Sequence, residues 1–242
     1  MEARSYFDAK FGPLSLGNVW EPVFDAERHR YSNGGRDLPS VSAILKPASS
    51  LAYGAIDKDV LAAAADFGTA IHACTEYLDH DELDMGSVLP EWKPYLAAYR
   101  KWLADVQPDH LAIEWRLCCS RYAGTIDRVS VIGSDVWVID LKTTSQLHPH
   151  VGLQLAAYER LAMPVLLTDI IRGDFEAPWK DQPTFLRRAA LQLRDDGTYR
   201  FREFKRVSDY RTFLGLLNFY EWTKETENDR TENNHHEPAR RR

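Results

Sequence analysis

The chain has 242 residues, of which 44% are hydrophobic and 12% are aromatic, and its formal net charge is −6. This length and composition suit one sizeable globular core. The charge excludes a surface coated in positive potential, but it does not exclude a DNA enzyme, because affinity for DNA depends on local phosphate contacts. No apolar run approaches the roughly 20 residues that span a bilayer, and residues 1–5 lack the pattern of a signal peptide, so we expect a cytoplasmic protein without a membrane partner.

The N-terminal part of the chain predicts a hairpin followed by two helices. Residues 20–45 are expected to form a hairpin about the turn Asn33–Gly35 and then an extended lead-in. Apolar residues recur at helical spacing over residues 57–79 and 92–105, so both segments are predicted to be helices.

A series of strands comes next. Strands are predicted over residues 110–119, 122–132 and 135–143, and the short turns between them indicate an antiparallel meander. A helix over residues 150–162 is expected to end at Pro164, because proline removes a helix hydrogen bond. A less regular stretch to Pro183 then leads into the last predicted elements, which are a hairpin over residues 185–194 and 198–205 and a helix over residues 207–223.

The order of these elements predicts an α/β fold with a single domain over residues 1–223. From Lys224 onward the chain is rich in charged residues and has almost nothing apolar. Residues 224–242 are therefore expected to form a disordered tail.

The most informative feature is an acidic and basic pattern on two of the predicted strands. Side chains two residues apart lie on the same face of a strand, so Asp140 and Lys142 are expected to project together while Leu141 turns into apolar packing. Asp127 precedes Asp140 by thirteen residues and lies inside another apolar run. A carboxylate in such a run is costly unless it is paired or binds a metal, which makes Asp127 a candidate ligand.

This set of residues suits the hydrolysis of a phosphodiester. The phosphate is already anionic, so an attacking hydroxide is repelled unless a cation neutralises it and lowers the pKa of the water. Magnesium and manganese prefer oxygen donors, and Asp127 and Asp140 would supply them. Lys142 would hold or deprotonate the attacking water, or would stabilise the charge that builds up on the phosphate oxygens.

Several motifs occur in the order seen in a known family. They are the segment Gly68–His72 followed by Glu76, Glu114 within residues 113–115, the segment Gly124–Asp127, the signature Asp140–Thr144, the pair Gln154 and Tyr158, and the lead-in Leu38–Leu45. Together they resemble the PD-(D/E)xK nuclease superfamily, and within it the RecB-like and phage-type exonuclease branch. The resemblance implies a restriction-endonuclease-like core of the α+β type, with a central mixed sheet flanked by helices.

The resemblance also implies roles for individual residues. His72, Asp127 and Asp140 would be the ligands of Mg²⁺ or Mn²⁺, with neutral imidazole as an ordinary metal donor. Glu114 would be a supporting acid and Lys142 the group that activates water or stabilises charge. Two further catalytic positions, Gln154 and Tyr158, would orient the lysine or the DNA backbone. Glu76, one turn beyond His72, either reaches the same site or is a solvated helix carboxylate.

The implied activity is that of a metal-dependent deoxyribonuclease, most specifically a double-strand DNA end-processing exonuclease in phage-type recombination or repair. Such an enzyme would act on DNA ends in the cytoplasm of a bacterial or phage-infected host cell. A homo-oligomer and a single-strand annealing protein are the partners that this branch implies. Two alternatives remain open: an endonuclease or flap nuclease on the same core, and a non-catalytic DNA-binding or assembly module that retains the fold.

Cysteines and basic residues give further expectations. Some relatives in the superfamily hold an iron-sulfur cluster with four cysteines, whereas this chain has three, so we expect no such cluster and interpret the cysteines as small buried apolar residues. Basic residues near the site strands and the last hairpin are candidates for DNA contacts or for a solvated face. The cysteines are Cys74, Cys118 and Cys119, and the basic residues are Arg116, Arg121, Arg128, Arg187, Arg188, Arg200, Arg202, Lys205 and Arg206.

Overall fold

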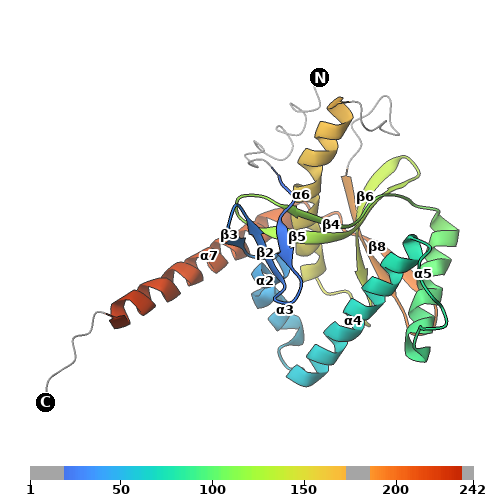
Figure 1. Cartoon of the computed structure of the whole chain (residues 1–242), viewed down its shortest axis with the longest axis horizontal. Coiled ribbons are helices and arrows are strands. Elements are labelled where there is room, and N and C mark those ends of the chain that lie inside the picture. The colour runs from blue at the N-terminus through green and yellow to red at the C-terminus, as the bar shows by residue number, and fades with distance from the viewer. Residues whose placement is uncertain (1–18, 173–185, 236–242) are drawn as a thin grey trace, which may run out of the picture.

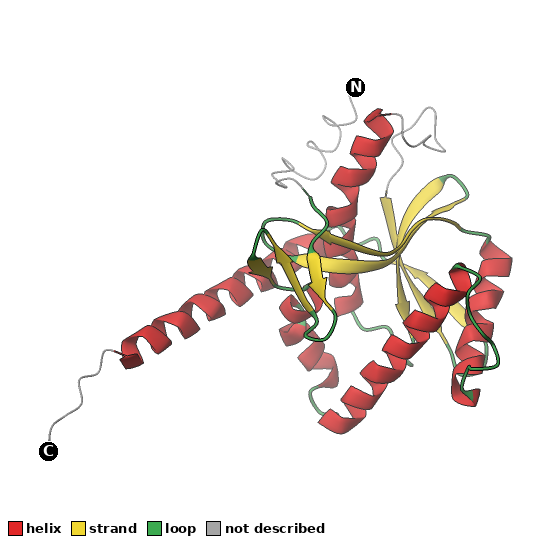
Figure 2. Ribbon diagram, in the orientation of Figure 1, coloured by secondary structure: helices red, strands yellow, loops and turns green. Residues whose placement is uncertain are grey.

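A computed structural model describes residues 19–172 and 186–235 of the chain. Its mixed α/β architecture confirms the predicted fold class, a central mixed sheet flanked by helices (Figure 1, Figure 2). The central sheet has the strand order β4-β5-β6-β7-β8. The strands are β4 (Asp109–Cys118), β5 (Ala123–Ile132), β6 (Asp135–Lys142), β7 (Leu186–Leu193) and β8 (Tyr199–Glu203).

The pairing of the central strands confirms the predicted meander. β4 pairs with β5 and β5 pairs with β6, both antiparallel, and Gly133 makes the second turn with a positive φ of 65°. β6 and β7 are parallel, so the chain must cross from one end of the sheet to the other between them. The crossing contains helix α6 (His150–Arg172), and β7 returns to an antiparallel partner in β8.

Helices cover both faces of the central sheet (Figure 1). On one face α6 packs on the sheet, and α7 (Ser208–His235) packs on α6. On the other face lie α4 (Lys58–Asp79) and α5 (Lys93–Val106), and α5 follows the short helix η1 (Pro90–Trp92). Alternate residues of β6 enter the two layers, as the period of a strand requires. Val136 and Val138 join the α6 side, and Trp137, Ile139 and Leu141 join the α4 side.

A smaller sheet of three antiparallel strands lies near the N-terminus. It consists of β1 (Val23–Asp25), β2 (Arg30–Asn33) and β3 (Arg36–Leu38). The expected hairpin is confirmed, and Gly34 and Gly35 turn it with positive φ angles of 57° and 80°.

The expected extended lead-in after this hairpin is wrong, because two short helices follow it. They are α2 (Val41–Ile44) and α3 (Lys46–Tyr53). The Ser40 hydroxyl accepts a hydrogen bond from the Ala43 amide at 3.0 Å and so caps α2, and Pro47 is placed in the first turn of α3, where its missing N–H costs no helix hydrogen bond.

The predicted end of a helix at Pro164 is also wrong. α6 continues through this proline to Arg172, so residues 163–172 of the expected irregular stretch are helical. Val165 and Leu166, which follow the proline, pack against the main hydrophobic core. This packing offsets the cost of a proline inside a helix, which is about 3 kcal/mol. Residues 173–183 of that stretch lie outside the described residues, as do residues 1–18 of the predicted domain.

The expected disordered tail is wrong over its first part, because α7 continues to His235. The segment lacks apolar residues but contains good helix formers, and Lys224 pairs with Glu227 one turn away, with Nζ 2.7 Å from Oε2. Residues 236–242 lie outside the described part of the chain. Within the described ranges, no helix is both long and apolar enough to cross a bilayer.

Candidate active site

The site lies where the hydrogen-bonded pairing of strands β5 and β6 ends. Their pairing runs from Ile132 opposite Asp135 to Arg128 opposite Ile139 and goes no further. The next amide of β6 that faces β5, that of Leu141, donates a 2.6 Å hydrogen bond to Asp127 Oδ2. A buried amide needs an acceptor, so the carboxylate takes the place of a strand partner. This contact fixes Asp127 between the two strands.

His72 on α4 reaches the same point. Its Nε2 lies 3.1 Å from the Leu141 carbonyl oxygen and its Nδ1 lies 3.6 Å from Asp127 Oδ2. A carbonyl oxygen can only accept a hydrogen bond, so Nε2 carries the proton. The lone pair of a neutral His72 is then on Nδ1, on the side of Asp127. Metal-binding histidines are commonly oriented in this way, with the other ring nitrogen donating to a backbone carbonyl.

Glu114 on β4 completes a group of three. One ligand atom each from His72, Glu114 and Asp127 lies within 4.8 Å of the others. Glu114 has a positive φ of 47° in the middle of its strand, a conformation that residues with side chains rarely adopt. Strain of this kind is most often found at functional sites, where the surrounding structure holds it in place.

Burial and charge act together on these three groups. Burial, followed by the charge of Asp127, raises the pKa of Glu114 to about 7. Burial opposes a charge on Asp127, but His72, Lys142 and the Leu141 amide outweigh it and lower the pKa of this carboxyl. Burial would lower the pKa of His72, yet Asp127 outweighs it and raises that pKa above 6.5. The three groups are therefore electrostatically coupled, and a bound cation would favour the charged form of both carboxylates.

Asp140 and Lys142 project together from β6, as the strand period predicts. Lys142 Nζ lies 2.6 Å from Asp140 Oδ2. Burial raises the pKa of Asp140 to about 6, with Lys142 opposing the rise and Asp127 adding to it. Burial would lower the pKa of Lys142, but Asp140 and Asp127 raise it overall, so the ammonium stays charged. Asp140, predicted as a ligand, is not a member of the compact group, whereas Glu114, predicted as a supporting acid, is.

Gln154 and Tyr158 lie one turn apart on α6. Gln154 Nε2 donates to the Tyr158 hydroxyl at 3.2 Å. Burial, followed by the charges of Asp140 and Asp127, raises the pKa of Tyr158 well above 10, so the hydroxyl stays protonated near the carboxylates. Tyr158 also packs on Gly124, where an added Cβ would lie 2.6 Å from the tyrosine ring. Five of the predicted motifs thus meet in one place.

Arg128 is a part of the site that the sequence did not assign. It was predicted as a candidate DNA contact, but its side chain is 0% exposed, which removes that role. Its Nε lies 2.6 Å from Asp79 Oδ2, and its Nη1 donates to the Asp127 carbonyl at 2.6 Å and lies 3.3 Å from Glu114 Oε1. The signal in the sequence is a charged residue inside the apolar run of β5. Arg128 holds the backbone of one group member and the carboxylate of another.

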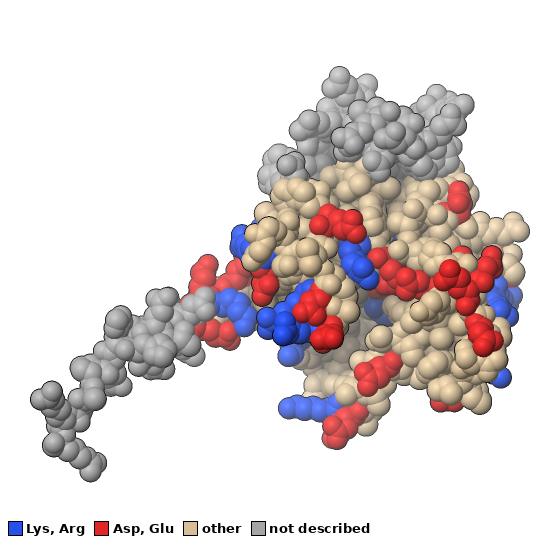
Figure 3. All heavy atoms as spheres, in the orientation of Figure 1, with Lys and Arg blue, Asp and Glu red and all other residues tan. Residues whose placement is uncertain are grey.

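The other predicted basic residues are largely engaged within the protein. Arg121 pairs with Glu221, and the guanidinium of Arg116 lies 5.0 Å from the centre of the Phe24 ring. Arg187, Arg188 and Lys205 also pair with carboxylates. Acidic and basic side chains lie interspersed on the face shown in Figure 3. These pairings favour the solvated or structural alternative for the basic residues over a broad DNA-binding surface.

The remaining candidates have clear positions. Glu76 is half-buried one turn beyond His72 and is not a member of the group of three. Burial and the charge of Asp127 are the larger causes of the raised pKa of Glu114, and the charge of Glu76 adds to them. Cys74, Cys118 and Cys119 are free and buried, as expected.

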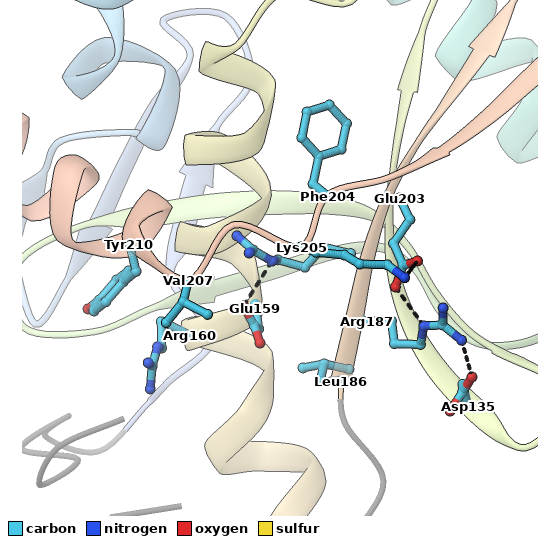
Figure 4. Close-up of a pocket in the computed structure, with 11 residues that line it drawn as sticks. Asp135, Glu159, Arg160, Leu186, Arg187, Glu203, Phe204, Lys205, Val207 and Tyr210 are labelled. Carbon is cyan, nitrogen blue, oxygen red and sulfur yellow. Dashed lines mark hydrogen bonds and ion pairs between the residues drawn. The ribbon is translucent and has the colours of Figure 1, made fainter. Parts of the chain in front are cut away.

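A separate pocket of about 420 Å³ lies at the opposite end of the parallel strands (Figure 4). Asp135 and Leu186, which begin β6 and β7, are among its lining residues. Its charged side chains face each other: Arg187 pairs with Asp135 and Glu203, and Arg188 pairs with Glu159. Because these charged groups pair with one another, we favour the group around Asp127 over this pocket as the candidate active site.

No model of a protein family matches the chain, and a search of curated proteins finds no match either.

Proposed function

We propose that the protein is a metal-dependent nuclease that hydrolyses DNA phosphodiesters. The observation that supports this most is the placing of two carboxylates and an imidazole within 4.8 Å of one another, beside the ion pair of Asp140 and Lys142. A non-catalytic DNA-binding module would gain nothing from this arrangement, because burying so many carboxylates costs stability. The two carboxylates and the imidazole would hold a cation, and the cation together with Lys142 would attract an anionic phosphate.

The residues present fit a divalent cation. His72 and the two carboxylates offer one nitrogen and at least two oxygen donors, a set that suits Mn²⁺ and Mg²⁺. The Leu141 carbonyl already binds the other imidazole nitrogen, so Nδ1 of His72 is oriented for a ligand. When bound, the cation would neutralise phosphate charge and increase the acidity of a water molecule. We assign the ligand role to Glu114, Asp127 and His72, with Asp140 adjacent.

Lys142 contributes charge to this site. Its pKa is raised, because Asp140 and Asp127 outweigh the effect of burial, so at neutral pH the amine is an ammonium and cannot accept a proton. Of the roles expected for Lys142, this favours the stabilisation of charge on the phosphate oxygens and the holding of water over the deprotonation of water. Asp140 keeps the ammonium in place, and Tyr158 with Gln154 borders the same carboxylates.

The first test is the digestion of end-labelled linear duplex DNA with Mg²⁺, with Mn²⁺ and with EDTA. Cleavage should require a metal and should fall at least about 100-fold in Asp127→Asn, which removes a ligand of the cation, and in Lys142→Met, which removes a positive charge that stabilises the transition state. Asp135→Asn is the matched control, since Asp135 begins the same strand at its other end, and it should keep activity. Equal activity of Asp127→Asn and the wild type would refute the proposal, as would metal-independent cleavage.

The finer proposal is an exonuclease that works from double-strand ends. It rests on the order of the sequence motifs, since the same carboxylates and lysine also serve an endonuclease. Linear duplex should be shortened progressively from its ends while covalently closed circles persist. Rapid nicking of closed circles by the wild type, lost in Asp127→Asn, would replace the exonuclease with an endonuclease and leave the nuclease proposal intact.

A further inference from the structure

Three aromatic side chains meet around the connection that leads from β6 to α6. Tyr53 is the last residue of α3, His150 is the first residue of α6, and His148 precedes it in the connection from β6. The ring centre of Tyr53 lies 4.7 Å from that of His148 and 5.6 Å from that of His150, edge-on to both. The two imidazoles are nearly parallel, with an angle of 7° between their planes and centres 5.9 Å apart. We call these three residues the aromatic cluster.

The aromatic cluster borders the candidate active site. Burial raises the pKa of Tyr53, and the charge of Lys142 opposes that rise. Burial, followed by the charges of Lys142 and His148, lowers the pKa of His150 to about 4. The helix geometry places the cluster in the same way: His150, Gln154 and Tyr158 are spaced four residues apart on α6 and so share one face of that helix. The cluster therefore lies at the end of the helix face that borders the carboxylates, and it supplies flat aromatic surface next to the group that would face a phosphate.

The rings are only partly covered. All three residues are half-buried, so part of each remains open to solvent. The segment between the lysine and the cluster is polar, and Thr144, Ser145 and Gln146 in it are exposed. An open aromatic surface edged by hydrogen-bonding side chains suits a planar group that has polar edges.

We propose that Tyr53, His148 and His150 form a stacking site for the nucleobase adjacent to the phosphate held at Lys142. The proposal rests on the proposed nuclease function. A base is one sugar away from its own phosphate, so a phosphate at Lys142 brings a base to the neighbouring surface. Stacking on aromatic rings accepts any of the four bases, because each has a π face, and it suits a nuclease without a required sequence. Stacking on the cluster would also help to separate a terminal base from its partner in the opposite strand.

Removal of a single base tests the proposal directly. Duplexes would carry an abasic residue at one of the two terminal nucleotides of either strand, and their binding would be measured by fluorescence anisotropy in EDTA, so that no turnover occurs. For the wild type, one abasic position should weaken binding between about 5-fold and 160-fold, the range expected for one stacked base. Tyr53→Leu and His148→Leu should bind the intact and abasic duplexes equally weakly.

Two controls complete the experiment. Tyr53→Phe keeps the ring and should keep the difference between intact and abasic DNA. Trp222→Leu removes an aromatic residue that is 57% exposed on α7, away from the site, and should also keep it. Melting temperatures would establish that each variant is folded. If Tyr53→Leu or His148→Leu does not fold, the other of the two carries the test.

The outcomes separate this inference from the proposed function. If the wild type cleaves DNA with metal but no abasic position changes its affinity, the stacking site is refuted and the nuclease stands. The same holds if Tyr53→Leu and His148→Leu both retain the difference between intact and abasic DNA. If the wild type neither binds nor cleaves DNA, the proposed function fails and the inference fails with it.

Discussion

Gly124 and Tyr158 approach each other more closely than a side chain at position 124 would allow. A Cβ at Gly124 would lie 2.6 Å from Tyr158 Cε1 and 3.3 Å from Val41 Cγ2, and both neighbours are buried. A single methyl group must therefore displace the tyrosine ring or the strand.

We expect Gly124→Ala to lower the free energy of unfolding by about 1–3 kcal/mol, the usual cost of overpacking a filled core. Urea unfolding measures this. Gly215→Ala is the matched control, because nothing lies within 4 Å of its added Cβ and it is inside α7. That control should be neutral or stabilising by up to about 1 kcal/mol, since alanine favours a helix. Equal effects at the two positions would show that the contact with Tyr158 is not tight.

At the level of single residues, the sequence indicated the carboxylates and the lysine but not their grouping. Strand period predicted that Asp140 and Lys142 share a face, because that depends on local geometry alone. It did not predict that Asp140 pairs with the lysine while Glu114 joins His72 and Asp127. That choice depends on the left-handed backbone of Glu114, and the burial of Arg128 depends on Asp79, 49 residues away. Contacts of this kind have no local signal.

Helix α7 has two parts that contribute unequally. Phe213 and Leu217 are 0% exposed and belong to the main core, where Phe213 packs edge-on against Tyr122 at 5.0 Å between ring centres. Farther along, Lys224, Glu225 and Glu227 are exposed. The first part packs in the main core beside α6, and the second projects from the molecule (Figure 1).

We expect Phe213→Ala to destabilise the protein by about 3–5 kcal/mol, through lost apolar burial and a cavity. Deletion of residues 224–242 should leave the melting temperature nearly unchanged, because that segment contains almost no apolar surface to bury. Calorimetry of both variants measures the contrast. A large drop in melting temperature on deletion would mean that the end of the chain docks on the domain.

The elements themselves were predicted best where their pattern was regular. The central strands and α4 and α5 begin and end within a few residues of their expected limits, because period-2 and helical spacing persist along them. The failures have local causes. α2 has only four residues, too few to show a period, and its start depends on the Ser40 cap. At Pro164, tertiary packing outweighs the intrinsic preference of proline to end a helix.

Across the whole molecule, a buried charge network joins α4, α5, β4 and β5. Asp79 contacts Arg128, and both its carboxylate oxygens accept from the Tyr99 hydroxyl at 2.8 Å. His110 of β4 lies 3.6 Å from Asp79 Oδ1. Burial opposes the charge on Asp79, but His110, Arg128 and Tyr99 outweigh it and lower the pKa of Asp79 below 3.8. The network connects the layer of helices to the site strands.

Because the pKa of Asp79 is lowered, the free energy of unfolding depends on pH in the acid range. The contribution of Asp79 is fully present above about pH 5 and is lost as the pH falls through 3.8 toward the folded pKa, because the unfolded state then binds the proton more readily. We expect Asp79→Asn to cost about 3 kcal/mol or more at pH 7, where it leaves Arg128 without its main partner. Urea unfolding should show this difference shrinking below pH 3.8. Asp105→Asn removes an exposed partner of Lys101, and it should change the free energy of unfolding little, both at pH 7 and below pH 3.8. A difference that stays constant down to pH 2 would contradict a depressed pKa at Asp79.

The left-handed backbone of Glu114 sets the stability of the fold against the proposed metal-dependent activity. A left-handed residue with a side chain costs about 1–2 kcal/mol, and a buried carboxyl whose pKa is about 7 adds a further cost. Glu114→Gly should therefore raise the melting temperature while abolishing metal-dependent cleavage, and a thermal melt beside a digestion assay would show both. A library of this chain sorted for thermal stability alone should then enrich glycine at position 114 and discard the activity. A melting temperature that falls in Glu114→Gly would show that its contact with Arg128 outweighs the strain.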